Sequence, residues 1–530
     1  MVFLLLAASA LLAQQSDSVP LYQNLGAYSR KITTSSPKAQ QYFDQGVRMT
    51  YGFGHPEGVR SFKAALRHDS TCAMCWWGIA WARGPYINAR MDSVSGVEAY
   101  AAAQKALALK SRANAVEQAL IEAMAVRYVA VPTRANRPGL DSAYANAMRV
   151  VASRHRKDLD ANTLFAEAMM VLRPWDQWTR TGDPKPGTEE VVATLEQILK
   201  RDIRHPGACH LYIHAVEASR QPERAEKCGE FLGAMIPGAS HIPHMPSHIW
   251  LRIGRYGDGV IANTRAWWVD QQSAYGGPPG IYPTHNLHML LTAAAYDGQS
   301  AVSMQAARDI ARFGQNAFYP MAVFVRFGRW REILEYQWAP THPYHRGVHA
   351  FARGLAHLAN ERADSARIYL QRVDSLVAVT PDSVQFGGHP QKSLLIMARA
   401  HLAAELFVAE KNYDEAVRAL EAAVPLEDSL TYDEPEPWPI ATRHVLGAVL
   451  LEAGRPADAE RVYRDDLIDH PRNGWALFGL EQALRAQRKT AEADRVKTQL
   501  QNAWARADVW LLSSRFPARK PGPLNLLHVH

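Results

Sequence analysis

A recurring spacing of small and aromatic residues constrains this chain more than any other feature of its sequence. Gly447 is followed twelve residues later by Ala459, and Tyr463 comes four residues after that. Residues 46–62 repeat the spacing with glycine, glycine and phenylalanine. Small residues at these offsets allow the two helices of a hairpin to pack closely. Helix-forming residues recur throughout and alternating β-branched residues are rare, so we predict a stack of helix pairs.

This pattern resembles the tetratricopeptide repeat (TPR) superfamily, whose unit is a pair of helices about 34 residues long. The resemblance is strongest in residues 440–500 and is also good in 40–90 and 244–270. It implies an all-α fold, a right-handed TPR-like solenoid of helical hairpins. A chain of 530 residues is too long for one compact core, which fits a solenoid or several domains. Segments such as GACHLYIHAVEAS and NGWALFGLEQAL also look like an exported bacterial TPR-like family, a resemblance that implies no activity.

The N-terminal segment predicts export. Residues 1–13, MVFLLLAASALLA, resemble a secretory signal peptide with a cleavage site after Ala13. We therefore expect a periplasmic or extracellular protein. No other apolar run approaches the roughly 20 residues that a transmembrane helix needs. The net charge of +7 is spread over the chain without a Lys/Arg block, which argues against nucleic acid as a partner.

The rest of the chain divides by composition. A loop rich in Trp, Pro and Gly separates two sets of repeats, and it either covers a groove or staples neighbouring repeats together. A final helix near 499–512 is expected to cap the stack. The expected segments are a polar lead (14–38), N-terminal repeats (39–172), the loop (173–188), His-rich repeats (189–320), C-terminal repeats with the capping helix (321–514) and a tail (515–530).

Histidine pairs at helical spacing are the main chemical signal. Positions four or three residues apart share one face of a helix. Two of the pairs are separated from each other by one repeat length of 34 residues. The pairs are His210 and His214, His244 and His248, and His285 and His288.

The TPR resemblance implies that these histidines line the concave groove, since His248 falls at the second position of its first helix. Imidazole suits Zn and Cu, and six imidazoles from three helices could hold two ions with three ligands each. Glu217, one turn beyond His214, is the candidate base. We expect His205 and His241 to be ligands or to lie behind the ligands. Cys209 is either part of that set or a small buried apolar residue. The zinc-protease pattern H-E-x-x-H is absent, as are nucleotide-binding and flavin-binding glycine motifs.

Two functional interpretations remain open from the sequence. The first is a metalloprotein with a Zn or Cu centre in the groove, which could be an enzyme. The second is a TPR scaffold whose groove binds a peptide, a protein partner, a glycan or a small molecule, with histidines that serve packing alone. Trp77 and Trp475 are expected to line the groove in either case.

The four cysteines leave further alternatives. Cys72 and Cys75 form a C-x-x-C pair, which in an exported protein could be a disulfide or a soft metal site. We do not expect Cys209 and Cys228 to be bonded. A hairpin folded about Gln221 leaves them about five residues, or roughly 7.5 Å, out of step, and bridged Cα atoms lie within about 7 Å.

Overall fold

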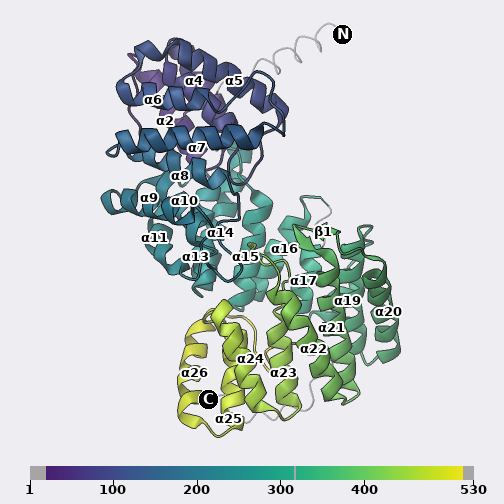
Figure 1. Cartoon of the computed structure of the whole chain (residues 1–530). Helices are drawn as coiled ribbons and strands as arrows, with labels where there is room; N and C mark the ends of the chain where they lie inside the picture. Colours follow the sequence, from purple (N-terminus) through teal and green to yellow (C-terminus); the bar gives the residue numbers. More distant parts are fainter. Residues whose placement is uncertain (1–18, 315–317, 517–530) are drawn as a thin grey trace, which may run out of the picture. The chain divides into compact units, whose positions relative to one another are not determined.

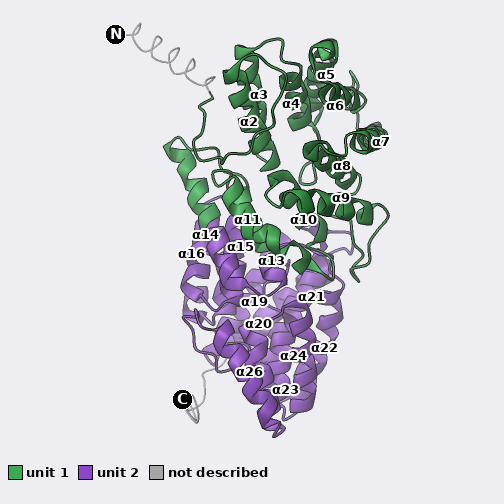
Figure 2. Cartoon of the chain, turned by 90° about the vertical axis from the view of Figure 1, so that its left-hand side faces the viewer, with its two compact units in different colours: residues 1–249, 265–283 green, residues 250–264, 284–530 purple. Residues whose placement is uncertain are grey.

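The fold is built almost entirely from antiparallel helices (Figure 1). In the computed structural model of the protein, residues 19–314 and 318–516 are described. The predicted signal segment and most of the tail lie outside these residues. Two compact units divide the chain: the first comprises residues up to 249 and 265–283, and the second comprises 250–264 and residues from 284 on (Figure 2).

The first unit consists of helical hairpins joined by short turns. Many helices begin at a side chain that caps the first turn, as at α6, where Asn114 and Glu117 form a reciprocal capping box. Its elements are α2 (Pro37–Tyr51), α3 (His55–His68), α4 (Ala73–Arg83), α5 (Ser93–Ala108), η2 (Lys110–Arg112), α6 (Ala115–Ala125), α7 (Arg137–Arg154), α8 (Leu159–Val171), α9 (Thr188–Arg201), α10 (Pro206–Val216), η3 (Pro222–Ala225), α11 (Glu226–Met235), α12 (His241–His244) and η4 (Ser273–Tyr275).

The second unit continues the hairpin pattern. Two helices are divided between the units, α13 (Pro246–Arg252) and α14 (Tyr256–Gln272). The remaining elements are α15 (Pro283–Tyr296), α16 (Ser300–Ala311), α17 (Phe318–Arg326), α18 (Trp330–Glu335), α19 (Pro343–Ala359), α20 (Ala363–Val379), β1 (Gln385–Phe386), β2 (His389–Pro390), α21 (Gln391–Ala409), α22 (Tyr413–Asp428), α23 (Thr442–Glu452), α24 (Pro456–Asp469), α25 (Gly474–Ala486) and α26 (Thr490–Ala503).

The packing order is that of a TPR-like stack. Helices adjacent in sequence form hairpins, such as α2 with α3 and α21 with α22, and the first helices of successive hairpins also touch, as α19, α21 and α23 do. In the first unit α10 contacts both α8 and α2. The end of α2 therefore lies beside α10, which carries two of the predicted histidines.

Glycines and aromatic rings pack closely within the hairpins, as the spacing of Gly46 with Phe62 and of Gly447 with Tyr463 predicted, and a glycine of the next hairpin approaches each ring as well. A Cβ on Gly46 or Gly78 would lie within 2.6 Å of a carbon of the Phe62 ring. In the second unit Gly447 and Gly479 approach the ring of Tyr463 in the same way. Any larger residue at these four positions would push the aromatic ring out of its place, which explains why the spacing recurs.

Two details of the C-terminal half differ from the prediction. The predicted capping helix at 499–512 is wrong, because α26 ends at Ala503 and a non-helical segment follows. In that segment the Asp508 carboxylate accepts the backbone N–H groups of Ser300 and Ala301, which begin α16. Negative charge is favourable at a helix N-terminus, so this segment takes the capping role.

A short hairpin interrupts the helices. Strands β1 and β2 are antiparallel and are joined by Gly387 and Gly388, both with positive φ. A Gly-Gly pair suits the two-residue turn of such a hairpin. No helix of the described residues is long and apolar enough to cross a membrane.

Candidate metal centre

Helix α10 carries the first histidine stripe of the first unit. The side chain of His205 caps this helix, because its Nδ1 accepts the N–H of Ala208, and Pro206 occupies the first turn. His210 and His214 lie one turn apart on the same face. Glu217 follows with backbone angles that are still helical, so it extends the stripe by another turn.

The second stripe lies on α12 and α13. Met245, which separates these helices, has φ −51° and ψ −37°, so the backbone stays helical through the junction. His241, His244 and His248 therefore fall at i, i+3 and i+7 on one face. All of these imidazoles are buried, as is Glu217. The sequence-based prediction of a groove lined by histidines is thus wrong in one respect: the cluster lies inside the protein.

The two stripes face each other and their nitrogens approach closely. Between the stripes, the Nε2 atoms of His210 and His241 are 3.2 Å apart, and within the second stripe those of His244 and His248 are 2.8 Å apart. One ring nitrogen from each of His210, His214 and His241 lies within 4.8 Å of the others. Sequence reasoning placed His241 as a ligand or behind the ligands, whereas the structure brings it into the cluster itself.

The stripes meet at an offset of 31 residues, as between His210 and His241. Glu217 and His248 are separated by the same offset, with Oε2 and Nδ1 2.7 Å apart. The two H-x-x-x-H pairs repeat at 34 residues, so facing helices are staggered by nearly one turn of 3.6 residues. The sequence did contain a signal for His241. It precedes His248 by seven residues, the same spacing by which His210 precedes Glu217 on the facing stripe.

Hydrogen bonds on the far side of the rings fix which nitrogen points into the cluster. Nδ1 of His210 donates to the backbone carbonyl of Tyr51, at 2.5 Å. The Glu217 carboxylate accepts from Nδ1 of His214 at 3.1 Å, and its other oxygen lies 2.7 Å from Nδ1 of His248. With the proton on Nδ1, the rings of His210 and His214 each present an Nε2 lone pair to the interior. Nε2 of His214 is buried and has no hydrogen-bond partner among the described residues.

Charge within the cluster is set by burial. Burial, with the nearby His214, lowers the pKa of His210 well below its usual value, and burial also lowers the pKa of His214. Burial raises the pKa of Glu217, but the two imidazoles beside it outweigh burial and lower it. A weakly basic carboxylate whose oxygens face two ring N–H groups is poorly placed to take a proton from a substrate. Glu217 is thus an orienting group, and the prediction of a base finds no support in its position.

Aromatic side chains enclose the cluster. The Phe53 ring lies 4.2 Å from the His210 ring between centroids and stacks on His214. Phe53 has φ 59°, a conformation that non-glycine residues adopt rarely and that tends to occur at functional sites. Sequence reasoning missed Tyr51 and Phe53. Tyr51 is 159 residues from its partner His210, so no local pattern could have revealed this contact.

The Trp-rich loop, residues 173–188, packs on α10. Nε1 of Trp178 donates to the carbonyl of Ala215, and the Trp175 ring meets His214 edge-on at 5.1 Å between centroids. Trp175 is 48% exposed, so it connects the histidine cluster to the protein surface. These contacts place the loop against α10.

Other predicted residues lie elsewhere. His205 bonds the Tyr28 hydroxyl and the Asp160 carboxylate, outside the cluster. Cys209 cannot be a metal ligand, because it is bonded to Cys228 with Cα atoms 5.2 Å apart. The expectation against this disulfide was wrong: η3 is a 3₁₀ turn with a longer rise per residue, and it shifts the register of the hairpin. Cys72 and Cys75 also form a disulfide.

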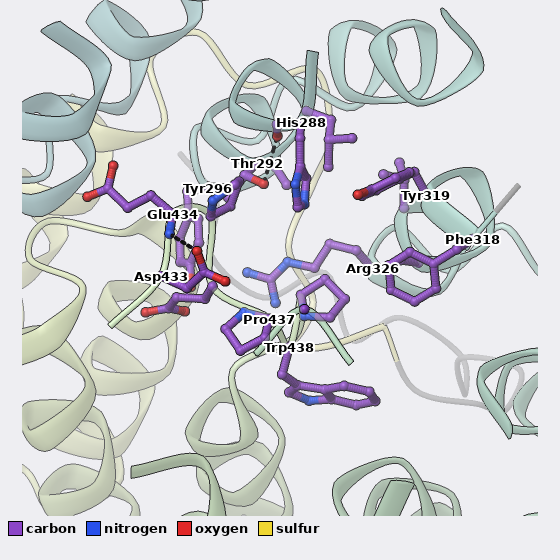
Figure 3. Close-up of a pocket in the computed structure, with 18 of the residues that line it drawn as sticks. His288, Thr292, Tyr296, Phe318, Tyr319, Arg326, Asp433, Glu434, Pro437 and Trp438 are labelled. Carbon is purple, nitrogen blue, oxygen red and sulfur yellow. Dashed lines mark hydrogen bonds between the residues drawn. The ribbon is translucent and has the colours of Figure 1, made fainter. Parts of the chain in front are cut away.

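The predicted tryptophans are not groove residues. Trp77 and Trp475 are 1% and 0% exposed, so both belong to the packed interior. His285 and His288 lie on α15 in the second unit. There His288 contacts the Tyr319 ring and lines a cavity (Figure 3). That this helix supplies ligands to the histidine cluster stays a prediction.

Comparison with known proteins assigns this chain to no family. No protein-family model matches the sequence, and no curated protein matches it. Solved structures similar to the chain include the human IFIT1 dimer with m7Gppp-AAAA, at 12% identity over 89% of this chain and 91% of that chain, with a TM-score of 0.32. A chain of the APC/C hetero-tetramer Cut9-Hcn1 is 12% identical over 96% of this chain and 80% of that one, with a TM-score of 0.30. The P58(IPK) TPR domain is 11% identical over 85% and 99%, with a TM-score of 0.22. By the packing of its own helices, the chain is an all-α assembly of stacked helical hairpins.

Proposed function

We propose that the first unit binds a transition metal ion, Zn or Cu, through the histidine cluster. The observation that carries the proposal is the tautomer pattern: hydrogen bonds hold Nδ1 of His210 and of His214 and leave each Nε2 facing the interior, and Nδ1 of His248 lies 2.7 Å from Glu217. Metal-binding histidines commonly donate their other N–H to a carboxylate or a backbone carbonyl. Both kinds of acceptor are found here.

The distances fit two ligands of one ion. A tetrahedral ion with Zn–N bonds of 2.0–2.1 Å separates two nitrogens by about 3.3 Å. The Nε2 atoms of His210 and His241 are 3.2 Å apart. His214, whose buried Nε2 lacks a partner, would supply the third ligand. His244 and His248 form a second close pair, which could hold a second ion with ligands from elsewhere.

A bound ion would supply Lewis acidity, and in the case of paired ions could polarise a substrate and lower the pKa of water. The chain itself supplies orientation and exclusion of water. Glu217 keeps two imidazoles in one tautomer, the Tyr51 carbonyl does the same for His210, and Phe53 covers the rings. The half-exposed ring of Trp175 lies against His214, 5.1 Å between centroids.

The metal content of the purified full-length protein tests this proposal. We expect near-stoichiometric Zn or Cu by mass spectrometry, and loss of that metal in His214→Ala/His248→Ala. His349→Ala is the matched control, since it removes a half-buried histidine of the second unit that belongs to no cluster. Metal-free wild-type protein that also fails to take up Zn or Cu on reconstitution would refute the proposal. That result would favour the scaffold function that TPR-like folds suggest.

Export is part of the proposed function. The apolar segment 1–13 resembles a signal peptide, and two disulfides among the described residues suit an oxidising compartment. Fractionation of cells that produce the native sequence would test it. Export predicts a protein outside the cytoplasm that lacks the first 13 residues, and a cytoplasmic protein with an intact N-terminus would contradict it.

A further inference from the structure

The second unit contains a cavity that is independent of the histidine cluster. Its volume is about 230 Å³, larger than the roughly 150 Å³ that admits a benzene ring. Helices α15 and α17 form one side, and the segment 433–439 before α23 forms another (Figure 3). The lining combines apolar side chains with charged groups of both signs.

Arg326, the last residue of α17, supplies a positively charged side chain to the lining of this cavity. It is 6% exposed, and it forms no ion pair with any carboxylate of the described residues. Of its five N–H donors, one reaches Nδ1 of His444 at 3.2 Å, and its Nε has no partner in the described part of the chain. Burial lowers the pKa of Arg326 to about 10, so it is still charged at neutral pH. Its guanidinium also lies over the Trp475 ring, 3.9 Å from the centroid, which offsets part of the cost of burying the charge. An anion that enters the cavity would complete the compensation.

The acidic groups behind Arg326 are already engaged. Nε2 of His444 donates to Asp466 at 2.9 Å, so this imidazole is neutral and accepts from Arg326. His470 lies between Asp466 and Glu436, at 3.1 and 2.8 Å. Burial lowers the pKa of His470, but the two carboxylates outweigh burial and raise it well above its usual value. His470 thus balances those carboxylates, and the charge of Arg326 is left for a ligand.

Carboxylates also line the cavity. Figure 3 shows the Arg326 side chain extending from α17 into the pocket. Asp433 and Glu434 lie on the opposite side of the pocket. Asp433 is held by Nε2 of His389 at 3.0 Å and by the N–H of Glu434. A simple anion would meet repulsion from these carboxylates. A ligand that also carries an ammonium group would instead pair with both sides.

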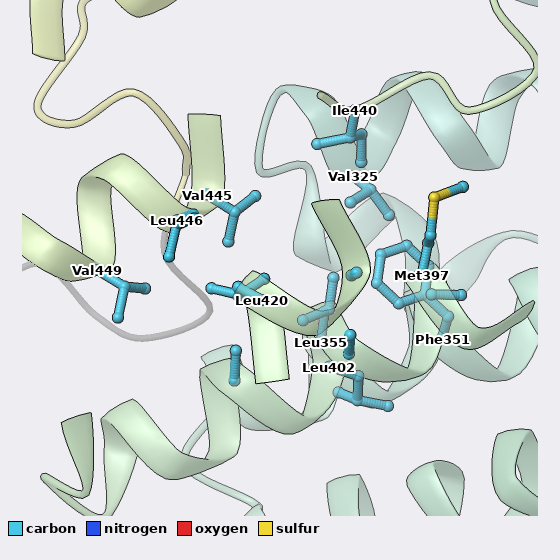
Figure 4. Packing of buried hydrophobic residues seen from close by; sticks show 14 of the residues in the cluster. Val325, Phe351, Leu355, Met397, Leu402, Leu420, Ile440, Val445, Leu446 and Val449 are labelled. Atoms are coloured by element: carbon cyan, nitrogen blue, oxygen red, sulfur yellow. The ribbon is translucent and has the colours of Figure 1, made fainter. Parts of the chain in front are cut away.

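The remaining walls are apolar and fixed in place. Val325 and Ile440 belong to the buried core of the second unit, next to Phe351 and Met397 (Figure 4). Val325 precedes Arg326 in the chain, and Ile440 follows the segment 433–439 that lines the cavity. A shift of Arg326 or of this segment would therefore disturb the packed core. Trp438, which lines the cavity, also packs in this core.

We propose that this cavity binds a free amino acid with an apolar side chain. The carboxylate pairs with Arg326, whose fork of donors suits a carboxylate. The ammonium group faces Asp433 and Glu434, and the side chain lies against apolar residues such as Leu291 and Val323.

Isothermal titration calorimetry of the full-length protein tests the ligand class. The probes are the proteinogenic amino acids at up to about 10 mM, with 3-phenylpropanoate and phenethylamine as analogues that each lack one charge of phenylalanine. We expect an apolar amino acid to bind and its singly charged analogues to bind about 10- to 100-fold more weakly. Absence of binding by every amino acid would overturn the proposal, and so would equal affinity for a singly charged analogue.

Two substitutions locate the site. Arg326→Gln should weaken binding of the best amino acid by about 10- to 100-fold, and Arg326→Lys should restore part of it. Arg399→Gln is the control, because Arg399 is a half-exposed arginine of the same unit that pairs with Asp374 outside the cavity. Unchanged affinity in a folded Arg326→Gln protein, checked by circular dichroism, would refute the assignment. If that variant does not fold, the comparison of the amino acid with its singly charged analogues on the wild-type protein still tests whether both charges of the ligand are recognised.

Discussion

Replacement of Glu217 by glutamine tests the metal centre without removing a ligand. The carboxylate has two oxygens that each face an imidazole N–H, on His214 and on His248. A glutamine amide has one oxygen, and its other end is an N–H₂ donor. One of the two imidazoles would therefore face a donor and would have to move its own proton from Nδ1 to Nε2. That ring could then no longer bind an ion.

The expected magnitude follows from the role of such partners. Loss of a hydrogen bond behind a metal-binding histidine typically weakens metal affinity by 10- to 100-fold. This corresponds to about 1.4 to 2.8 kcal/mol of binding free energy. Glu217 is 1% exposed, so water cannot replace the lost acceptor. We expect a loss of metal affinity in the upper half of this range, because the one substitution affects the rings of both His214 and His248.

Competition against a chromophoric chelator, with the apoprotein titrated by Zn or Cu, measures the affinity. Glu167→Gln is the matched control: Glu167 is another buried glutamate of the first unit, and its carboxylate accepts from Nε1 of Trp81 instead of from an imidazole. Wild-type affinity in Glu217→Gln would refute the reasoning. Equal losses in both variants would show that the effect is general destabilisation of the unit.

Three further predictions concern stability. Gly447→Ala should lower the free energy of unfolding by about 1–3 kcal/mol in urea denaturation, because the new Cβ meets the Tyr463 ring at 2.4 Å; no change would mean that the ring is not locked there. His470→Gln should cost most stability below about pH 6.5 and progressively less as the pH rises, since a raised folded-state pKa stabilises only while the imidazole is protonated. A loss independent of pH, in urea melts across this range, would contradict that charge state. Cys228→Ser should lower the free energy of unfolding by about 3 kcal/mol, because it opens a loop closed across 19 residues at Cys209; reduction of the wild type should reproduce the loss, and a wild type insensitive to reductant would argue against the bond.

The helical hairpins could be predicted from the sequence because their signals are local. The glycine at position 46 and the ring of Phe62 contact each other within one hairpin, so their spacing is visible in a short window. The histidine stripes are equally local, since the α-helix period alone decides that His210 and His214 share a face. The Gly387-Gly388 pair is also a local signal for a hairpin turn, although the sequence analysis did not predict the small β-hairpin.

The contents of the sites could not be predicted in the same way. The carbonyl that orients His210 comes from Tyr51, 159 residues away, and Arg326 meets His444 across 118 residues. The disulfide of Cys209 depends on a 3₁₀ turn whose register no spacing rule supplied. Each of these contacts depends on how whole hairpins pack against one another.

By itself the sequence determined that the chain forms stacked helical hairpins and that histidines lie in stripes on two of the helices. Both follow from the helix period, which backbone hydrogen bonds fix within a few residues. Only the tertiary structure decided that His210 meets His241, that Glu217 lies behind the rings and that the cluster is buried. The stagger between neighbouring helices decides those contacts, and it results from the summed packing of many side chains distant in the sequence.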